Sequence, residues 1–218
     1  MNATQQITLS SEINQTAKMQ GYYRFHAKIY DVTRWTFLFG RKQLSDSLPY
    51  QSTDTPTIME VGCGTGSNIE KLSHHFPKAQ LIGVDVSAAM LDIADKKLVN
   101  VPNFVVLKQN NYGVETLNLS QKPDCILFSY CLTMVNPNWE NLVLQAKSDL
   151  EKDGIIAIVD FDTSRFKWFR RWMQFNHVRM EGHILPFLEQ HFQTVRSERC
   201  RAYFGLWHYL VYIGMVKQ

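Results

Sequence analysis

Three alternating glycines carry the strongest chemical signal in this chain. Gly62, Gly64 and Gly66 directly follow an apolar stretch, and such a turn lets the backbone approach a ligand more closely than any side chain would allow. About twenty residues further on, a second apolar stretch ends in the carboxylate of Asp85. A glycine loop followed by an acid at the end of the next strand indicates a nucleoside-cofactor site at the carboxyl edge of a parallel sheet.

The spacing of the glycines bears on which nucleoside the site would bind. In a dinucleotide fingerprint the third glycine comes three residues after the second, where the helix start holds a pyrophosphate. Here Ser67 occupies that position and Gly66 comes one residue early. Glu60 also places a negative charge before the loop, which disfavours a diphosphate and favours a cationic ligand. The pattern therefore favours a cationic nucleoside over a dinucleotide or a purely structural turn.

The pattern E-x-G-x-G-x-G from Glu60 to Gly66 resembles the first motif of class I S-adenosylmethionine-dependent methyltransferases. The resemblance implies S-adenosyl-L-methionine, which carries a sulfonium and an ammonium, as the cofactor and S-adenosyl-L-homocysteine as the product. It implies that Asp85 holds both ribose hydroxyls. Asn110 stands where the family usually has an acid, and its amide oxygen could still accept a hydrogen bond from the adenine amino group. The predicted cofactor-binding residues are Glu60, Gly62, Cys63, Gly64, Gly66, Asp85, Val86, Met90, Asn110, Asn111 and Ser129.

The elements that must position these residues alternate between apolar strands and helical patterns. The predicted strands are 57–61, 80–85, 104–107, 124–130 and 155–161, and the predicted helices are 67–75, 88–97 and 139–150. This alternation predicts a parallel sheet, and the aromatic stretches 192–200 and 203–215 predict a final antiparallel hairpin at its edge. The expected fold is α/β: a Rossmann-like seven-stranded, mostly parallel sheet with helices on both faces and an antiparallel last strand. The resemblance implies the same architecture.

We expect a flexible polar tail over residues 1–20 and one domain over residues 21–218, opening with a lid helix over 21–45. Residues at three- and four-residue steps share one face of this helix, and they are Tyr23, His26, Tyr30, Arg34 and Phe37. Tyrosine rings attract cations and arginine can clamp a carboxylate, so this face suits a lid over the sulfonium, with Arg34 binding substrate. The alternative is a docking helix whose polar tips reach solvent.

The run YYRFHAKIYDVTRWTFLFGR, from Tyr22 to Arg41, resembles the N-terminal signature of bacterial diacylglyceryl-homoserine N-methyltransferases, enzymes of betaine-lipid synthesis. The stretches 128–135, 159–161, 168–170 and 203–209 are similar to that family too. The resemblance implies three successive methyl transfers to the amine of a lipid-linked homoserine. The residues that could orient the amine or take up a proton are Tyr23, His26, Tyr30 and Tyr130.

Residues 162–191 are predicted to form a basic amphipathic insertion. Between Arg165 and Arg201 there are eight basic and three acidic residues, a local formal charge of +5. On a helical wheel, Lys167, Arg170 and Arg171 lie opposite an apolar half. That half consists of Phe166, Trp168, Phe169, Trp172, Met173 and Phe175. This pattern is typical of a helix that binds an anionic membrane surface, and equally of one that packs its aromatic side chains on the sheet.

Composition and charge are ordinary for a globular protein, with 45% apolar residues, 20% charged residues and a formal net charge of +3. No membrane span or signal peptide is apparent, so we expect a cytoplasmic protein that binds peripherally at the inner face of the membrane. The four cysteines lack the spacing of a metal or redox site, and no metal is expected.

The stretch 136–139, Asn-Pro-Asn-Trp, resembles the Asn-Pro-Pro-aromatic motif of nucleic-acid base methyltransferases. It lies beyond the strand end and lacks the second proline, so no nucleic-acid partner is expected.

Three other functions are compatible with the same sequence. Phosphatidylethanolamine N-methylation would share the fold, the cofactor and the surface chemistry. A small-molecule or quinone methyltransferase would leave the basic helix without a role. A non-catalytic cofactor-binding subunit would use the N-terminal aromatics as a partner surface. Vesicle binding at varied salt separates the lipid-facing functions from the others, because salt screens electrostatic docking.

Overall fold

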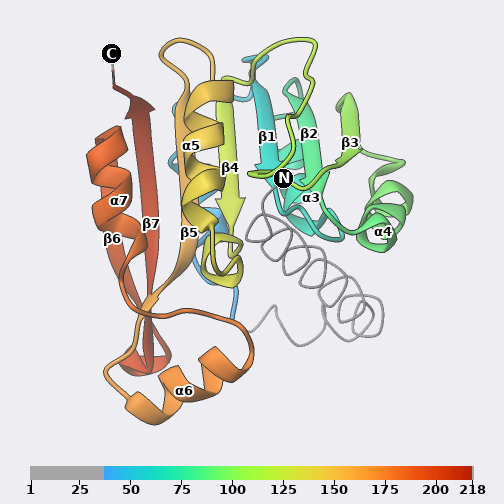
Figure 1. Ribbon diagram of the computed structural model, residues 1–218. Helices are drawn as coiled ribbons and strands as arrows, with labels where there is room; N and C mark the ends of the chain where they lie inside the picture. Colours follow the sequence, from blue (N-terminus) through green and yellow to red (C-terminus); the bar gives the residue numbers. More distant parts are fainter. Residues whose placement is uncertain (1–36, 218) are drawn as a thin grey trace, which may run out of the picture.

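Seven strands form one mixed sheet at the centre of the computed structural model, which describes residues 37–217 (Figure 1). Their order is β3-β2-β1-β4-β5-β7-β6, and every neighbouring pair is parallel except that β7 runs antiparallel to β5 and β6. The strands are β1 (Thr57–Val61), β2 (Gln80–Asp85), β3 (Val105–Gln109), β4 (Cys125–Ser129), β5 (Ile155–Thr163), β6 (Phe192–Ala202) and β7 (Trp207–Val216). The predicted mostly parallel seven-stranded sheet with an antiparallel last strand is confirmed.

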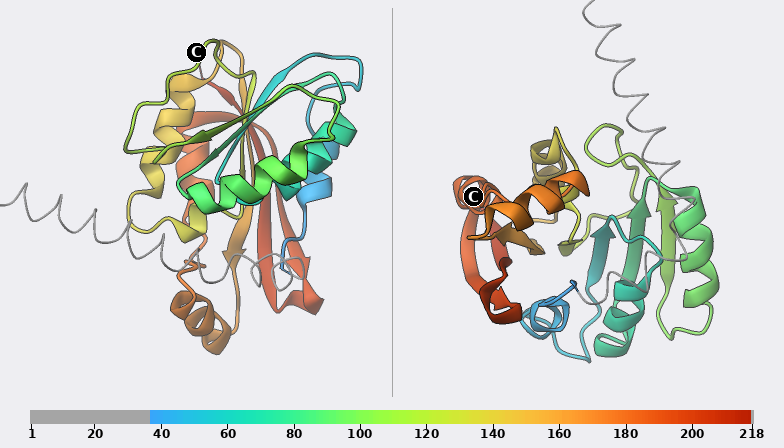
Figure 2. Two further views of the ribbon diagram at one scale, coloured as in Figure 1. Left: turned by 90° about the vertical axis from the view of Figure 1, so that its right-hand side faces the viewer. Right: turned by 90° about the horizontal axis from the view of Figure 1, so that it is seen from below.

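Helices cover both faces of the sheet (Figure 2). They are α2 (Arg41–Asp46), α3 (Ser67–His75), α4 (Ala88–Leu98), α5 (Trp139–Asp149), α6 (Lys167–Phe175) and α7 (Ile184–His191), with 3-10 turns η1 (Leu132–Met134) and η2 (Tyr203–Gly205). Ile58 of β1 lies in the apolar cluster that α2, α3 and α4 share, whereas Met59 lies in the cluster of α5 and α7. Successive strand residues thus face opposite layers, and β1 and β4, buried at every position, take the centre.

Within the described part of the predicted helix over 21–45, only residues from Arg41 onward are helical. Residues 37–40 are not helical, and α2 begins only at Arg41. Gly40 has a φ of 79°, and an added Cβ would lie 2.5 Å from the Tyr209 ring. Because only glycine tolerates both that backbone conformation and that contact, the chain turns here instead of continuing as a helix.

The predicted insertion over 162–191 divides into two helices with different surroundings. The second, α7, packs against the sheet and buries Ile184 and Leu188. The first, α6, lies at the end of the molecule toward which the parallel strands point, beside the turn between β6 and β7 (Figure 1). Within residues 37–217, no helix is long and apolar enough to cross a membrane.

Candidate functional site

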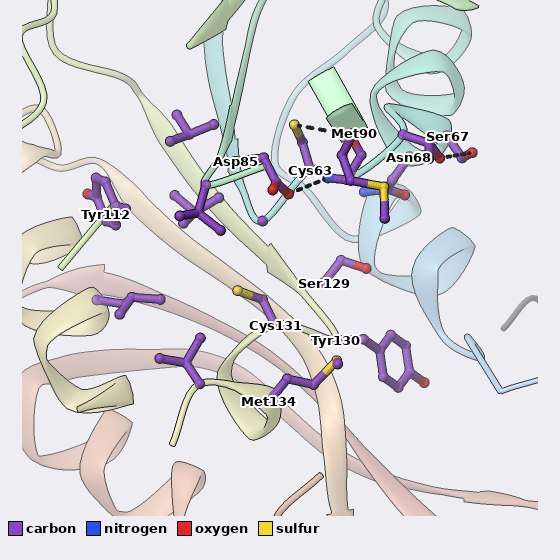
Figure 3. A pocket seen from close by; sticks show the side chains of 18 of the residues that line it. Cys63, Ser67, Asn68, Asp85, Met90, Tyr112, Ser129, Tyr130, Cys131 and Met134 are labelled. Atoms are coloured by element: carbon purple, nitrogen blue, oxygen red, sulfur yellow. Dashed lines mark hydrogen bonds between the residues drawn. The ribbon is translucent and has the colours of Figure 1, made fainter. Parts of the chain in front are cut away.

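A pocket opens at the carboxyl edge of β1, β2 and β4, where the loops after these strands meet (Figure 3). It is lined by Leu38, Arg41, Val61, Gly62, Cys63, Gly64, Thr65, Ser67, Asn68, Val84, Asp85, Val86, Met90, Asn110, Asn111, Tyr112, Ser129, Tyr130, Cys131, Met134, Val135 and Leu142. Of the eleven predicted cofactor-binding residues, all but Glu60 and Gly66 line this pocket. The structure thus brings most of the predicted site together from separate parts of the chain.

The three glycines of the loop after β1 share a left-handed backbone but have different surroundings. Gly64 has a φ of 54°, and a Cβ added there would meet nothing within 4 Å. A Cβ on Gly62 would lie 2.7 Å from the Cys131 sulfur, and one on Gly66 would lie 3.0 Å from Ala94. Gly64 therefore keeps open the space of the pocket. The predicted cofactor residue Gly66 does not line the pocket, and its lack of a side chain lets α3 begin close against α4.

Asp85 ends β2 with its carboxylate fixed at the pocket wall (Figure 3). Its Oδ2 accepts a hydrogen bond from the Gly64 amide at 2.8 Å, and its Oδ1 accepts one from the Ser87 amide at 2.9 Å. Burial raises the pKa of Asp85, while these backbone donors oppose that shift. The carboxylate oxygens, with further lone pairs, can still accept hydrogen bonds from ligand hydroxyls.

An unsatisfied acceptor lies beside Asp85 in the pocket lining, since the Asn110 backbone amide donates a hydrogen bond of 3.1 Å to the Asp85 backbone carbonyl. The Oδ1 atom of Asn110 is buried and has no hydrogen-bond partner within the described part of the chain. Val86 and the buried side chain of Met90 lie in the same pocket wall. Since a buried polar atom without a partner is costly, Asn110 is suited to a ligand that donates a hydrogen bond beside an apolar slot.

Two charged side chains near the loop make contacts that the sequence did not predict. The Arg41 Nε donates a hydrogen bond of 2.7 Å to the Ser129 hydroxyl, so the start of α2 reaches the end of β4. Glu60 does not line the pocket; it is buried and accepts a hydrogen bond of 3.0 Å from the Asn68 amide. Burial raises the pKa of Glu60 to about 7, against the opposing charge of Arg41. The predicted cofactor residue Glu60 thus lies outside the pocket lining, with its side chain bonded to the first turn of α3.

Tyr130 is the one predicted catalytic residue among those that the structure describes. It lines the pocket, has a φ of 55°, and donates its hydroxyl to the carbonyl of Phe39 at 2.7 Å. The other predicted residues of the acceptor site lie outside residues 37–217, and they are Tyr23, His26, Tyr30 and Arg34. The lining residues that sequence reasoning missed come from loops and also from the ends of strands and helices, such as Val61, Val84 and Asn68.

Cys63 and Cys131 contribute sulfur atoms to the pocket wall. Burial raises the pKa of the Cys63 thiol well above its ordinary value, and the nearby carboxylates of Asp85 and Glu60 act in the same direction. A protonated thiol is a poor nucleophile, so Cys63 serves as apolar wall. In the part of the chain that the structure describes, no group of three or more His, Cys, Asp or Glu residues could hold a metal ion.

The comparison with protein families decides what kind of protein carries this pocket. A family model described as a methyltransferase domain matches residues 34–204, most of the chain. The chain belongs to this methyltransferase family. The match covers the glycine loop, the lining of the pocket from Leu38 to Leu142, and α6, so the predicted enzyme class is confirmed.

Curated relatives of the methyltransferase match parts of it. A malonyl-[acyl-carrier protein] O-methyltransferase of Bacillus cereus is 30% identical over 118 residues, which are 54% of this chain and 42% of the relative. A trans-aconitate 2-methyltransferase of Acidovorax is 49% identical over 45 residues, or 21% of this chain and 17% of the relative. The methyltransferase spans less than half the length of these relatives.

Known structures share its fold over most of their length. The Burkholderia thailandensis 1,6-didemethyltoxoflavin-N1-methyltransferase, solved with S-adenosylhomocysteine, superposes with a TM-score of 0.69 and 16% identity, covering 94% of this chain and 90% of that one. The N-methyltransferase NodS of Bradyrhizobium japonicum, also solved with S-adenosylhomocysteine, gives 0.64 and 17%, covering 82% and 86%. At these identities the likeness establishes the fold alone.

The pocket of the methyltransferase fits S-adenosylmethionine, the predicted cofactor. The backbone at Gly64 borders open space that could hold the methionine part of the ligand, because no side chain occupies it. The Asp85 carboxylate offers acceptors for two ligand hydroxyls. The unpartnered oxygen of Asn110 suits the amino group of an adenine. A cationic nucleoside would thus meet acceptors at Asp85 and Asn110, next to the apolar side chains of Val86 and Met90.

Proposed function

We propose that this protein is an S-adenosylmethionine-dependent N-methyltransferase that methylates the amine of a lipid head group, converting diacylglyceryl-homoserine to the trimethylated betaine lipid. The observation that carries the proposal is the pocket, in which Gly64, Asp85 and the unpartnered oxygen of Asn110 face one space. Ser129 and Tyr130 line the same space. The choice of acceptor is supported by the resemblance of residues 22–41 and 128–135 to enzymes of betaine-lipid synthesis.

Each polar group in the pocket has a role in this proposal. Asp85 accepts hydrogen bonds from both ribose hydroxyls, which requires that its carboxylate stay ionised, as the Gly64 and Ser87 amides favour. Asn110 accepts from the adenine amino group. Arg41, held against Ser129, offers a guanidinium to a carboxylate, which both the cofactor and the homoserine head group carry.

S-adenosylmethionine supplies a methyl group on a positively charged sulfur. The lone pair of the acceptor amine forms the new nitrogen–carbon bond while the electrons of the carbon–sulfur bond return to sulfur, so the positive charge passes to nitrogen. A proton leaves nitrogen after the first and the second transfer, and none after the third, because the quaternary product has no proton on nitrogen. The amine must therefore enter each transfer unprotonated.

The described residues contribute alignment and a dry environment. Apolar side chains that line the pocket, Met134, Val135 and Leu142, withdraw the amine from water and lower its pKa toward neutrality. Holding amine and methyl in line supplies several kcal/mol of the barrier, on the order of what intramolecular alignment achieves. No covalent intermediate is needed, since a neutral amine is itself a good nucleophile.

A second candidate function is methylation of a carboxylate. The curated relatives are named for malonyl-[acyl-carrier protein] and trans-aconitate, both of which carry carboxylates. Arg41 in the pocket wall would hold such an acceptor as readily as a homoserine carboxylate. The two functions differ in the atom that receives the methyl group, nitrogen or oxygen.

The test uses the purified full chain, S-adenosylmethionine with a labelled methyl group, and acceptors offered in parallel. These are diacylglyceryl-homoserine and phosphatidylethanolamine in mixed micelles, trans-aconitate, and malonyl-[acyl-carrier protein]. The proposal expects label in mono-, di- and trimethylated homoserine lipid, stable to the mild alkali that cleaves methyl esters. Label that appears only in an alkali-labile ester would overturn it in favour of carboxylate methylation. An Asp85→Ala preparation run alongside should lose transfer to every acceptor.

A further inference from the structure

Helix α6 exposes a stripe of aromatic side chains instead of burying it. Only Phe169 and Met173 of this helix are buried. Trp168, Trp172 and Phe175, at positions i, i+4 and i+7, are 63%, 48% and 86% exposed. Residues at this spacing lie along one line of a helix, so the three rings form a continuous outward stripe beside the buried pair. A helix that served only to cover the sheet would not leave its largest side chains in water.

The turn between β6 and β7 presents a second exposed aromatic group at high conformational cost. Phe204 is fully exposed, and both it and Tyr203 have left-handed backbone conformations, with φ values of 56° and 44°. For bulky residues such conformations cost about 1 kcal/mol or more each and are concentrated at functional positions. A strained turn thus keeps the Phe204 side chain exposed to solvent.

The buried ring of Trp207 contacts both α6 and the turn between β6 and β7. The Trp207 ring stacks on Phe169 of α6 at 5.5 Å and contacts Tyr203 of the turn at 4.9 Å. Figure 1 shows α6 and the turn side by side at the end of the molecule where the parallel strands finish, which is also the end where the pocket opens. The stripe on α6 and Phe204 therefore form one surface, here named the aromatic end.

The same helix carries exposed basic side chains along the border of the aromatic end. The exposed basic side chains in and before α6 are Arg165, Lys167, Arg170 and Arg171. No acidic residue occurs anywhere from Thr163 to Met180. Exposed tryptophan and phenylalanine side chains bordered by arginine and lysine match the interface of an anionic bilayer, where rings enter the head-group region and cations meet phosphates.

We propose that the aromatic end is a docking surface for an anionic lipid bilayer. This inference deepens the proposed function, on which it rests, because it names the surface from which a lipid-linked acceptor would reach the pocket. The pocket and the aromatic end share a boundary: Phe39 contacts the Tyr203 ring at 5.2 Å and accepts the hydroxyl hydrogen bond of Tyr130, which lines the pocket. Docking there places the pocket beside the head groups.

The experiment measures co-sedimentation of the full chain with vesicles of phosphatidylcholine alone or mixed with phosphatidylglycerol. The wild-type chain should bind the mixed vesicles, and bind them less as salt rises. Phe204→Ser and the charge reversal R170E/R171E should each weaken binding about tenfold or more, as expected for a lost apolar anchor and reversed interfacial charges. Matched controls lie at the amino ends of the parallel strands, away from the aromatic end: Phe104→Ser, at a phenylalanine 69% exposed before β3, and K78E/K152E before β2 and β5.

Binding of S-adenosylhomocysteine, measured by calorimetry on every variant, separates this inference from the proposed function. Intact cofactor binding shows that a variant is folded, so weakened sedimentation then supports the docking surface. The inference is overturned if the wild-type chain fails to sediment with mixed vesicles, binds neutral vesicles equally well, or loses as much binding through the controls as through the aromatic-end variants. Absence of S-adenosylhomocysteine binding to the wild-type chain would instead overturn the proposed function.

Discussion

The hydroxyl of Tyr130 donates a hydrogen bond of 2.7 Å to the carbonyl oxygen of Phe39. Tyr130 directly follows β4, while Phe39 lies just before the turn at Gly40 that starts α2. The bond therefore joins the wall of the pocket to the segment that brings Arg41 to Ser129. It gives the Tyr130 hydroxyl a positioning role, which differs from the proton-handling role that the sequence left open.

Replacing Tyr130 by phenylalanine tests that role. Tyr130→Phe should lower the free energy of unfolding by about 1 kcal/mol, the net contribution of one hydrogen bond, as measured by urea denaturation. Methyl transfer should slow without any change in the shape of its pH profile, because the hydroxyl proton is not transferred. Tyr50→Phe removes a comparable bond to the Asp124 carbonyl away from the pocket and should affect stability alone. A shifted pH profile in Tyr130→Phe would assign its hydroxyl to proton transfer.

Asp85 is expected to dominate the affinity for the cofactor. Asp85→Ala removes the acceptor of the ribose hydroxyls and the anchor of the Gly64 amide, and should weaken S-adenosylhomocysteine binding by about 2–3 kcal/mol, roughly 30- to 150-fold. Calorimetry measures the change directly. Asp92→Ala, at an exposed acid on α4, controls for the loss of one negative charge. Equal affinities for the wild type and Asp85→Ala would remove Asp85 from the site.

Two glycines of the same loop should respond to alanine in opposite ways. In Gly64→Ala the new methyl enters the open pocket, so cofactor affinity should fall at least about tenfold with only about 1 kcal/mol of backbone strain. In Gly62→Ala the methyl would press on the Cys131 sulfur at 2.7 Å, so the loss should be mainly in thermal stability. Adding Cys131→Ala to Gly62→Ala should recover part of that stability. The same response from both single variants would contradict the assignment of the open space to the ligand.

The buried Glu60 should make the protein less stable as pH rises. Its pKa is raised from 4.5 to about 7 by burial, so between these values the unfolded chain loses a proton that the folded protein keeps. Stability then falls with rising pH across that window and levels off above it. Glu60→Gln should remove this decline, gaining on the order of 2 kcal/mol over the wild type between pH 5 and pH 8 in denaturant titrations. A difference between the two proteins that is constant with pH would show that Glu60 ionises normally.

Local signals in the sequence were enough to predict most of the sheet. The bounds of β1, α3 and β2 are those predicted, because an apolar run, glycines and a capping position define each of them within a few residues. The predicted lid helix does not continue through Gly40. A side chain at this position would clash with the ring of Tyr209, which is far away in the sequence. The pattern of residues 21–45 could not predict this close approach, because it depends on a residue outside that segment.

The sequence by itself determined the order of the elements, the glycine loop and the acid at the end of β2, because these depend on residues that are neighbours along the chain. Only the tertiary structure decided that Glu60 is buried outside the pocket lining while Arg41 lines the pocket, because both depend on packing between distant elements. It also decided that α6 exposes Trp168 and Phe175, which a helical wheel cannot distinguish from core residues. Whether the apolar face of a helix is buried depends on which elements pack against it. The amphipathic pattern of the sequence shows only that the helix has such a face.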